Sequence, residues 1–194
     1  MSIAAMILAA GGSRRLGRPK QMLVHDGETL LNRAIRRASD AGAGPVLVVL
    51  GAQFEMIRAS IQSSSALVVH NDRWRQGMGR SVAEGMRALA VCAPDVDGVL
   101  LMGCDQPLLT ADHLRALLNA FASPGVPAIA ASSYAGINGV PAVFPRETFD
   151  DLRALRGDKG ARSVIEHAAL PVAAVEFAGG DVDIDAPEDL ANLQ

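Results

Sequence analysis

The sequence predicts an α/β fold in which a mostly parallel, Rossmann-like sheet lies between two layers of helices, a three-layer αβα sandwich. Short apolar runs recur along the chain, and Ile3 to Ala9 and Pro45 to Leu50 are the clearest. Strands that are apolar on both faces are typical of a parallel sheet covered by helices on both sides. Apolar residues at helical spacing separate these runs, which indicates βαβ units.

Strands and helices are expected to alternate along the chain. The first helix is expected to end at Gly42, and Thr110 is expected to cap the fourth. The expected strands are Ile3 to Ala9, Pro45 to Leu50, Ala66 to Val69, Gly98 to Met102, Pro127 to Ala131, Val140 to Phe144 and Val172 to Phe177. The expected helices are marked by Leu30 to Ala38, by Phe54, Ile57 and Ile61, by Val82 to Leu89, by Leu114 to Phe121, by Arg146 to Leu155 and by Gly160 to Ala168.

Composition and charge narrow the class of protein. The 194 residues, 49% hydrophobic and 20% charged, indicate one globular domain over residues 1–194. The net charge of −3 argues against nucleic-acid binding, which normally needs a basic excess. No apolar run approaches the roughly 18 residues that span a bilayer, and the apolar start indicates a strand, not a signal peptide. We therefore expect a cytoplasmic protein with no membrane partner, whose Cys92 and Cys104 are small core residues.

The stretch LAAGGSRRLGRPKQ, Leu8 to Gln21, directly follows the first expected strand. In open α/β sheets, ligands bind beyond the carboxyl ends of the strands. Gly11 and Gly12 allow a sharp turn that brings backbone N–H groups against an anion, although the spacing fits neither GxxxxGKS/T nor GxGxxG. The alternative is a glycine turn followed by a solvated basic loop. The cations that would bind a polyphosphate are Arg14, Arg15, Arg18 and Lys20.

Acidic residues follow two later strands. Asp105 comes shortly after the apolar run that ends at Met102, where a lone carboxylate is either a helix cap or surface residue, or a magnesium ligand. Asp181, Asp183 and Asp185 alternate with apolar residues and so share one face of an extended segment. Like charges on one face repel unless a cation lies among them; the alternative is an exposed strand end before a helix. The sequence therefore offers carboxylates for a metal at the same sheet edge as the glycines.

The residues from Leu8 to Lys20 resemble the LAAGxSxRxGxxK signature of MobA-like nucleotidyltransferases, and most of all the branch that acts on molybdenum cofactor. Leu16 departs from the pattern of this branch, which commonly has Met at that position. The DQP that begins at Asp105, the segment NDRWRQGMGRS and the closing DIDAPEDL are similar to further motifs of the family. Trp74 in the second of these is either part of the nucleotide site or a packing residue. The resemblance implies the nucleotide-diphospho-sugar transferase type of fold.

The resemblance also implies roles for individual residues. Arg15, Lys20 and Asp105 would be catalytic, the two cations acting on the phosphates and the carboxylate on Mg²⁺. The metal ligands would be Asp105 together with Asp183 or Asp185, of which Asp183 ranks first. No histidine is given a role. The implied nucleotide-binding residues are Leu8, Ala9, Ala10, Gly11, Gly12, Ser13, Gly79 and Ser81, and those facing the second substrate are Gly139, Lys159 and Arg162.

The function that the resemblance implies is Mg²⁺-dependent transfer of CMP from CTP to the terminal phosphate of molybdenum cofactor (molybdopterin), with release of pyrophosphate. CTP is favoured because Ala10 gives LAAG, where guanylyltransferases have LAGG. GTP or UTP, and a sugar or alcohol phosphate as acceptor, remain alternatives. A different class of function is a carrier that holds the cofactor for a molybdoenzyme client without transferring a nucleotide. The intact set of Gly11, Lys20 and Asp105 favours the enzyme.

Overall fold

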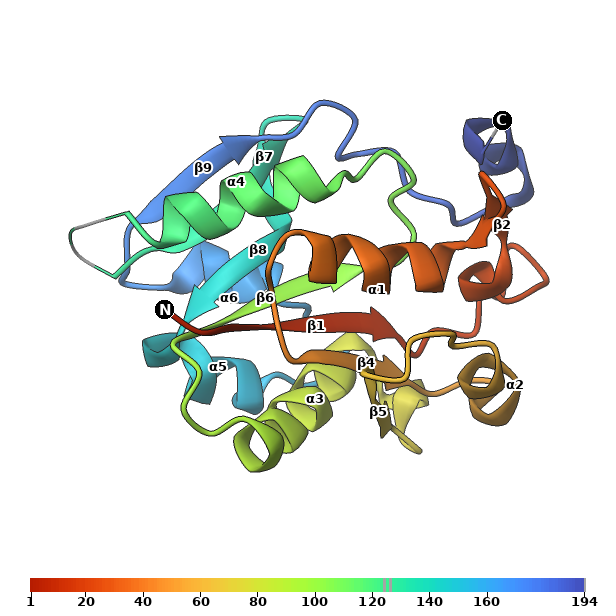
Figure 1. Ribbon diagram of the computed structural model, residues 1–194, viewed down its shortest axis with the longest axis horizontal. Coiled ribbons are helices and arrows are strands. Elements are labelled where there is room, and N and C mark those ends of the chain that lie inside the picture. The colour runs from red at the N-terminus through yellow and green to blue at the C-terminus, as the bar shows by residue number, and fades with distance from the viewer. Residues whose placement is uncertain (124, 126, 194) are drawn as a thin grey trace.

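The computed structural model describes residues 1–123, 125 and 127–193. A seven-stranded sheet with the strand order β5-β4-β1-β6-β8-β7-β9 forms its centre (Figure 1). The strands of this sheet are β1 (Ile3–Ala9), β4 (Val46–Leu50), β5 (Leu67–His70), β6 (Gly98–Gly103), β7 (Ile129–Tyr134), β8 (Ile137–Pro145) and β9 (Val172–Glu176), and a separate small sheet contains β2 (Val24–His25) and β3 (Glu28–Thr29). The α-helices are α1 (Leu30–Asp40), α2 (Phe54–Ala59), α3 (Met78–Cys92), α4 (Ala111–Phe121), α5 (Phe149–Ala154) and α6 (Arg162–His167), and the short 3-10 helices are η1 (Lys20–Met22), η2 (Trp74–Gln76), η3 (Arg146–Thr148) and η4 (Pro187–Leu193).

The sheet is mostly parallel, as the sequence predicted. β1 pairs in parallel with β4 and β6, and β4 pairs in parallel with β5. β8 is antiparallel to both β6 and β7, and the turn between β7 and β8 has φ of 47° at Ala135 and 76° at Gly136. Positive φ at both turn residues is typical of tight hairpins, and this hairpin extends β7 beyond the expected end at Ala131. β7 therefore runs in the same direction as β6, and the hairpin turn lies at the carboxyl edge of the sheet.

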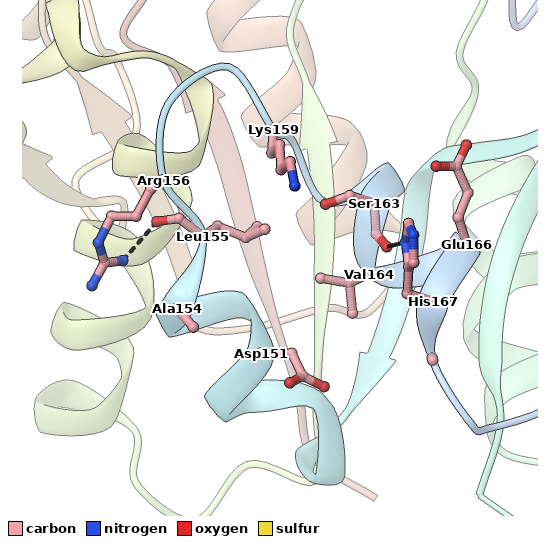
Figure 2. A pocket seen from close by; sticks show the side chains of 10 residues that line it. Asp151, Ala154, Leu155, Arg156, Lys159, Ser163, Val164, Glu166 and His167 are labelled. Carbon is pink, nitrogen blue, oxygen red and sulfur yellow. Dashed lines mark hydrogen bonds between the residues drawn. The ribbon is translucent and has the colours of Figure 1, made fainter.

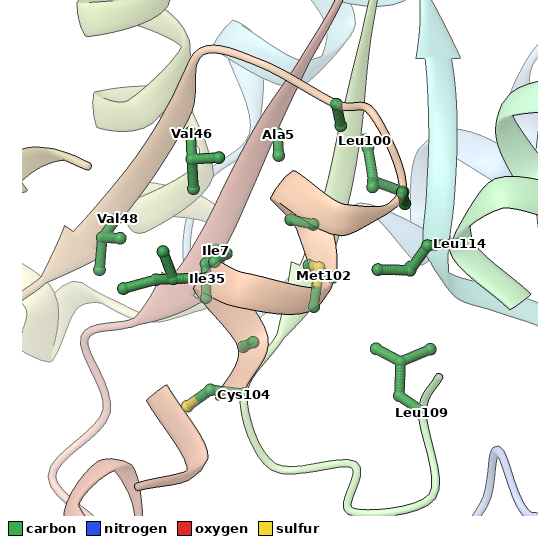
Figure 3. Packing of buried hydrophobic residues seen from close by; sticks show 14 of the residues in the cluster. Ala5, Ile7, Ile35, Val46, Val48, Leu100, Met102, Cys104, Leu109 and Leu114 are labelled. Carbon is green, nitrogen blue, oxygen red and sulfur yellow. The ribbon is translucent and has the colours of Figure 1, made fainter. Parts of the chain in front are cut away.

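Helices cover both faces of the sheet, which confirms the three-layer architecture (Figure 1). On one face α1 and α4 pack in a cluster that contains Ala5 and Ile7 of β1, and Figure 3 shows Ile35 of α1 within it. On the other face α3, α5 and α6 pack in a cluster that contains Ala4 and Met6. Alternate residues of a strand point to opposite faces, so β1 is buried on both sides. Its carboxyl end is thereby held at the middle of one edge of the sheet.

Helix boundaries differ from the expected ones in two places. α2 ends at Ala59, so Ile61 lies beyond the helix, although it still packs against the core. The helix expected over residues 146–155 divides into η3 and α5. The cap at Thr110 is confirmed, because its hydroxyl accepts a hydrogen bond from His113 N at 3.1 Å. Gly42 follows α1 with φ of 95°, which is the left-handed conformation expected of a glycine after a helix.

The two cysteines have different environments. Cys104 is buried, as expected, but Cys92 is exposed, so its assignment to the core was wrong. Cys92 lies at the last residue of α3, where the helix ends and the side chain faces solvent. Within the described ranges, no helix has the length and apolar character needed to cross a membrane.

Candidate active site

The glycine loop, residues 10–17, leaves the carboxyl end of β1 and turns back toward η1. Its left-handed residues are Ser13, with φ of 46°, and Gly17, with φ of 74°, so the sharp turn expected at Gly11 and Gly12 lies further along the chain. Gly12 is packed closely against Trp74, because a Cβ there would lie 3.0 Å from Cη2 of Trp74 and the ring would have to shift slightly. A Cβ at Gly11 would meet no described atom within 4 Å. Packing therefore favours a small residue at position 12, whereas Gly11 faces open space.

The buried side chain of Gln21 holds the start of the glycine loop in place. Its side chain is fully buried, and Nε2 donates hydrogen bonds to Ala9 O at 2.7 Å and to Gly11 O at 3.0 Å. Ser13 adds two more bonds, since its carbonyl accepts from Gly17 N and its hydroxyl accepts from the backbone N of Lys20. Gln21 was not predicted as a site residue, because the sequence does not show which backbone groups an uncharged side chain will bind. The loop thus has a fixed backbone before any ligand binds.

Lys20 brings three segments of the chain together. Its Nζ lies 2.5 Å from Asp105 Oδ2, after β6, and 2.7 Å from Asp185 Oδ1, in the acidic segment formed by residues 181–185. Burial alone would lower the pKa of Lys20, but the charge of Asp105 and the hydrogen bonds to both carboxylates outweigh it and raise this pKa. Hydrogen bonds from Lys20 and the nearby charge of Arg15 lower the pKa of Asp185. Arg15 Nη2 lies 2.7 Å from Asp185 Oδ2, so the expected cations and carboxylates do meet.

Asp183 differs from Asp185 because no described cation is paired with it. Limited hydration and the charge of nearby Asp105 raise the pKa of Asp183 to about 6, although its side chain reaches solvent. In the part of the chain that the structure describes, no three His, Cys, Asp or Glu side chains form a ready metal cluster. Mg²⁺ commonly uses only one or two carboxylates and completes its shell with phosphate oxygens and water. Repulsion between Asp105 and Asp183 would be relieved by a divalent cation, so this pair suits such an ion.

A central cavity of about 430 Å³ opens beside the glycine loop. It collects residues from the loop, from η1, from the start of α3 and from the end of β6, which are separate parts of the sequence. Ala9, Arg15, Asp183 and Asp185 are not among its lining residues. The residues that line it are Leu8, Ala10, Gly11, Gly12, Ser13, Arg14, Lys20, Trp74, Arg75, Gly77, Met78, Ser81, Asp105 and Asp158.

Several lining residues were not singled out from the sequence. The guanidinium of Arg75 lies 4.5 Å from the centre of the Trp74 ring, a cation–π arrangement at the cavity wall. Trp74 also packs tightly, since a Cβ at Gly51 would lie 2.5 Å from Trp74 Cβ. Trp74 is therefore a packing residue that also lines the cavity, and its part in nucleotide binding stays a prediction. Asp158 could not be recognised because its segment reaches the cavity only through tertiary contacts.

Two residues expected at the nucleotide site occupy different surroundings. Ser81 lines the cavity, and its hydroxyl accepts a hydrogen bond from Asn71 Nδ2 at 3.0 Å. Gly79 does not line it. Its N–H donates to Gly157 O at 2.9 Å, and a Cβ would lie 2.7 Å from Lys159 O. Close packing against residues 156–159 accounts for this glycine, so the expected nucleotide contact is not what the geometry requires of it.

The residues expected to face a second substrate are not gathered at the central cavity. Lys159 lines a different cavity of about 760 Å³, and Figure 2 shows it beside Ser163 near the α5 and α6 segments. Arg162 donates from Nε to Glu166 Oε1 at 2.8 Å on α6. Gly139 lies in β8, where a Cβ would be 2.5 Å from the hydroxyl of Tyr134. These three residues were grouped by sequence motif, and folding places them on separate elements.

A family model described as a MobA-like NTP transferase domain matches residues 5–173. The chain belongs to this family. This MobA-like protein is 33% identical over 195 residues to the purine catabolism protein PucB of Bacillus subtilis (strain 168), with 95% of this chain and 92% of PucB covered. It is 36% identical over 101 residues to a probable molybdenum cofactor guanylyltransferase of Opitutus terrae, with 50% of each protein covered.

Solved structures agree with the family assignment. The crystal structure of Rv0371c from Mycobacterium tuberculosis H37Rv has a TM-score of 0.84 and 31% identity to this MobA-like chain, covering 100% of it and 97% of Rv0371c. A structure of Rv0371c in complex with manganese has a TM-score of 0.80 and 29% identity, covering 100% of this chain and 98% of that one. The nucleotide-diphospho-sugar transferase type of fold is thereby confirmed.

Proposed function

We propose that this MobA-like nucleotidyltransferase transfers CMP from CTP to the terminal phosphate of molybdenum cofactor and releases pyrophosphate. The observation that carries the proposal is the central cavity, which places the glycine loop, Lys20 and Asp105 around one space. A triphosphate needs backbone N–H groups or cations along its oxygens and a divalent ion between them. Gly11 leaves open space where such an anion can approach the backbone closely.

The proposed roles follow from which charges are already paired. Asp105 and Asp183 would hold Mg²⁺, because Asp183 has no described cation partner and is repelled by Asp105. Asp185 would instead orient Arg15 and Lys20, to which it is paired at 2.7 Å in each case. When bound, Mg²⁺ would neutralise charge on the phosphate oxygens. Arg15 and Lys20 would then stabilise the negative charge that builds up on the leaving pyrophosphate.

The chemistry requires little beyond positioning. An oxygen of the acceptor phosphate attacks the α-phosphorus in line, the new P–O bond forms, and the bond to the β-phosphate oxygen breaks to release pyrophosphate. The attacking phosphate is already anionic, so no side chain has to remove a proton. The contribution of the chain is therefore to hold two anions together and to offset their charge.

The choice of CTP rests on Ala10, which lines the central cavity. A methyl group there leaves less room beside a purine than glycine would. The choice of acceptor is supported by the family and by the relative named as a molybdenum cofactor guanylyltransferase. We propose Lys159, Arg162 and Gly139 for the acceptor side. Lys159 lines the neighbouring cavity and directly follows Asp158, which lines the central cavity. An acceptor could therefore contact both residues.

A panel of CTP, GTP and UTP, each with Mg²⁺ and either molybdenum cofactor or a sugar or alcohol phosphate, tests the proposal. We expect pyrophosphate release only with CTP and molybdenum cofactor. We also expect CTP with Mg²⁺ to raise Tm, because a ligand that binds the native state stabilises it by mass action. Cofactor binding without pyrophosphate release from any triphosphate would instead indicate the carrier.

A further inference from the structure

Gln106, the residue after Asp105, connects the end of β6 to the acidic segment. Its side chain is only 7% exposed, and Nε2 donates a hydrogen bond to Gly180 O at 2.7 Å. The partner is a backbone carbonyl, which can only accept, so the amide nitrogen must face it. The proposed roles of Asp105 and Asp183 do not include this contact. Gln106 is therefore a buried polar group without an assigned task.

A second contact holds the other end of the same segment. Ile184 N donates to Asp105 O at 2.9 Å, and the Ile184 side chain is fully buried in a small cluster with Leu16 and Leu23. Gly180, the residue before the acidic segment, is thus bound to Gln106, and Ile184, within the segment, is bound to Asp105. Asp183 lies between these two points. The two hydrogen bonds therefore hold the backbone on both sides of Asp183.

The chemistry of the Gln106 side chain indicates that this position requires its N–H donor and not only a side chain of the same volume. Its Oε1 is buried with no hydrogen-bond partner among the described residues. Burying a polar atom without a partner costs about 1–3 kcal/mol, which a methionine of similar size would avoid. Glutamine occupies this position although its buried oxygen is unpaired among the described residues. The donor to Gly180 is the part that methionine cannot replace.

We propose that Gln106 is a positioning residue that sets the place of Asp183 opposite Asp105 for binding a divalent cation. This inference rests on the proposed function, because it assumes that these two carboxylates hold the metal. Groups that orient metal ligands commonly change metal affinity or activity by 10–100-fold when they are removed. Gln106 acts through the backbone at Gly180 and does not itself touch the ion.

The test is a titration of the whole protein with Mn²⁺ followed by electron paramagnetic resonance, without nucleotide. We expect Gln106→Met to bind Mn²⁺ roughly 10–100-fold more weakly than the wild type. Thr148→Val is the matched control, because Thr148 is also buried and its hydroxyl donates to Pro145 O at 2.7 Å. Pro145 pairs with Gly98, at the end of β6 away from Asp105. Both variants should lower Tm, but only Gln106→Met should weaken Mn²⁺ binding.

A double-mutant cycle identifies the route of the effect. If Gln106 acts through Asp183, the loss caused by Asp183→Asn should be much smaller in the Gln106→Met background than in the wild type, since coupled residues are not additive. Gln106→Glu has the same shape and cannot donate while ionised, so it replaces Gln106→Met if the latter does not fold. Unchanged Mn²⁺ affinity in a folded Gln106 variant, or additive losses, would overturn the inference. Wild-type protein that binds no Mn²⁺ would overturn the metal assignment, whereas normal Mn²⁺ binding without nucleotide transfer would overturn only the proposed reaction.

Discussion

Lys20 Nζ lies 2.5 Å from Asp105 Oδ2 and joins two segments that are 85 residues apart in the chain. The same nitrogen lies 2.7 Å from Asp185 Oδ1, so one ammonium connects the glycine loop, the end of β6 and the acidic segment. The proposed phosphate-binding cation Lys20 is thus already paired with Asp105, one of the two proposed metal ligands. We expect nucleotide binding to exchange these partners, with Lys20 moving to the phosphates.

Replacing Lys20 should destabilise the protein more than replacing Arg15. Lys20→Met leaves Asp105 and Asp185 without their shared cation at a largely buried position, whereas the Arg15 side chain is 73% exposed and its ion pair is screened by water. We expect a loss of about 1–3 kcal/mol in the free energy of unfolding for Lys20→Met and of about 0–1 kcal/mol for Arg15→Met, measured with urea. Equal losses would contradict the view that Lys20 is the central cation.

Replacing Asp105 should greatly reduce turnover and leave the fold intact. We expect Asp105→Asn to reduce pyrophosphate release by about 100-fold or more, the effect of losing a group that stabilises charge in the transition state. Asp112→Asn is the control, since that carboxylate is 89% exposed on α4. Circular dichroism and Tm check folding in both. Turnover that survives in folded Asp105→Asn would remove this carboxylate from the reaction.

Stability should depend on pH through Asp183. Its pKa is raised from 3.8 to about 6 in the folded protein, so the folded state holds this proton more tightly than the unfolded chain does. The resulting stabilisation is fully present below pH 3.8 and is lost as the pH rises through about 6. Because Asp183 is exposed and water screens it, we expect Asp183→Asn to stabilise the metal-free protein at pH 8 by only about 1 kcal/mol. Urea unfolding at pH 5 and pH 8 measures how much Asp183→Asn raises the free energy of unfolding at each pH. A larger increase at pH 5 than at pH 8 would contradict a raised pKa for Asp183.

Ala10→Gly should shift the preference for the nucleotide base toward GTP. Removing the methyl group makes room beside a purine and converts LAAG to LAGG. A change of one methyl group in a binding pocket is worth roughly 10-fold or more in discrimination. The ratio of kcat/KM for GTP to that for CTP measures the shift. An unchanged ratio, with both activities retained, would show that Ala10 does not set the base.

Much of the fold could be predicted because its signals are local. Apolar runs predicted the strands of the main sheet. Because ligands bind beyond the carboxyl ends of strands in open α/β sheets, the glycine loop and Asp105 could be predicted as part of the site. The β2–β3 hairpin was missed, although Asp26 and Gly27 in its turn are a recognised hairpin pair. Exposed Cys92 was misplaced because burial at a helix end depends on what the rest of the chain covers.

The site was predicted less completely because its supports are contacts distant in sequence. Gln21 and Gln106 act on backbone carbonyls, a role that residue type does not reveal. Sequence alone ranked Asp183 above Asp185 without a physical reason. The geometry supplies a physical reason, since Asp185 forms ion pairs with two cations whereas Asp183 has no described cation partner. Lys159 was grouped with the acceptor site by its motif, yet it lines a separate cavity.

The reversed direction of β8 has a consequence for how this protein family can diversify. The hairpin turn at Ala135 and Gly136 lies at the carboxyl edge of the sheet, whereas β1, which leads into the glycine loop, pairs with β4 and β6. Both turn residues are exposed, so a longer turn can extend into solvent, whereas deleting either residue would change the register of β7 against β8. Insertions at this turn are therefore expected to be tolerated without disturbing the pairing of β1 with β4 and β6, which positions the glycine loop.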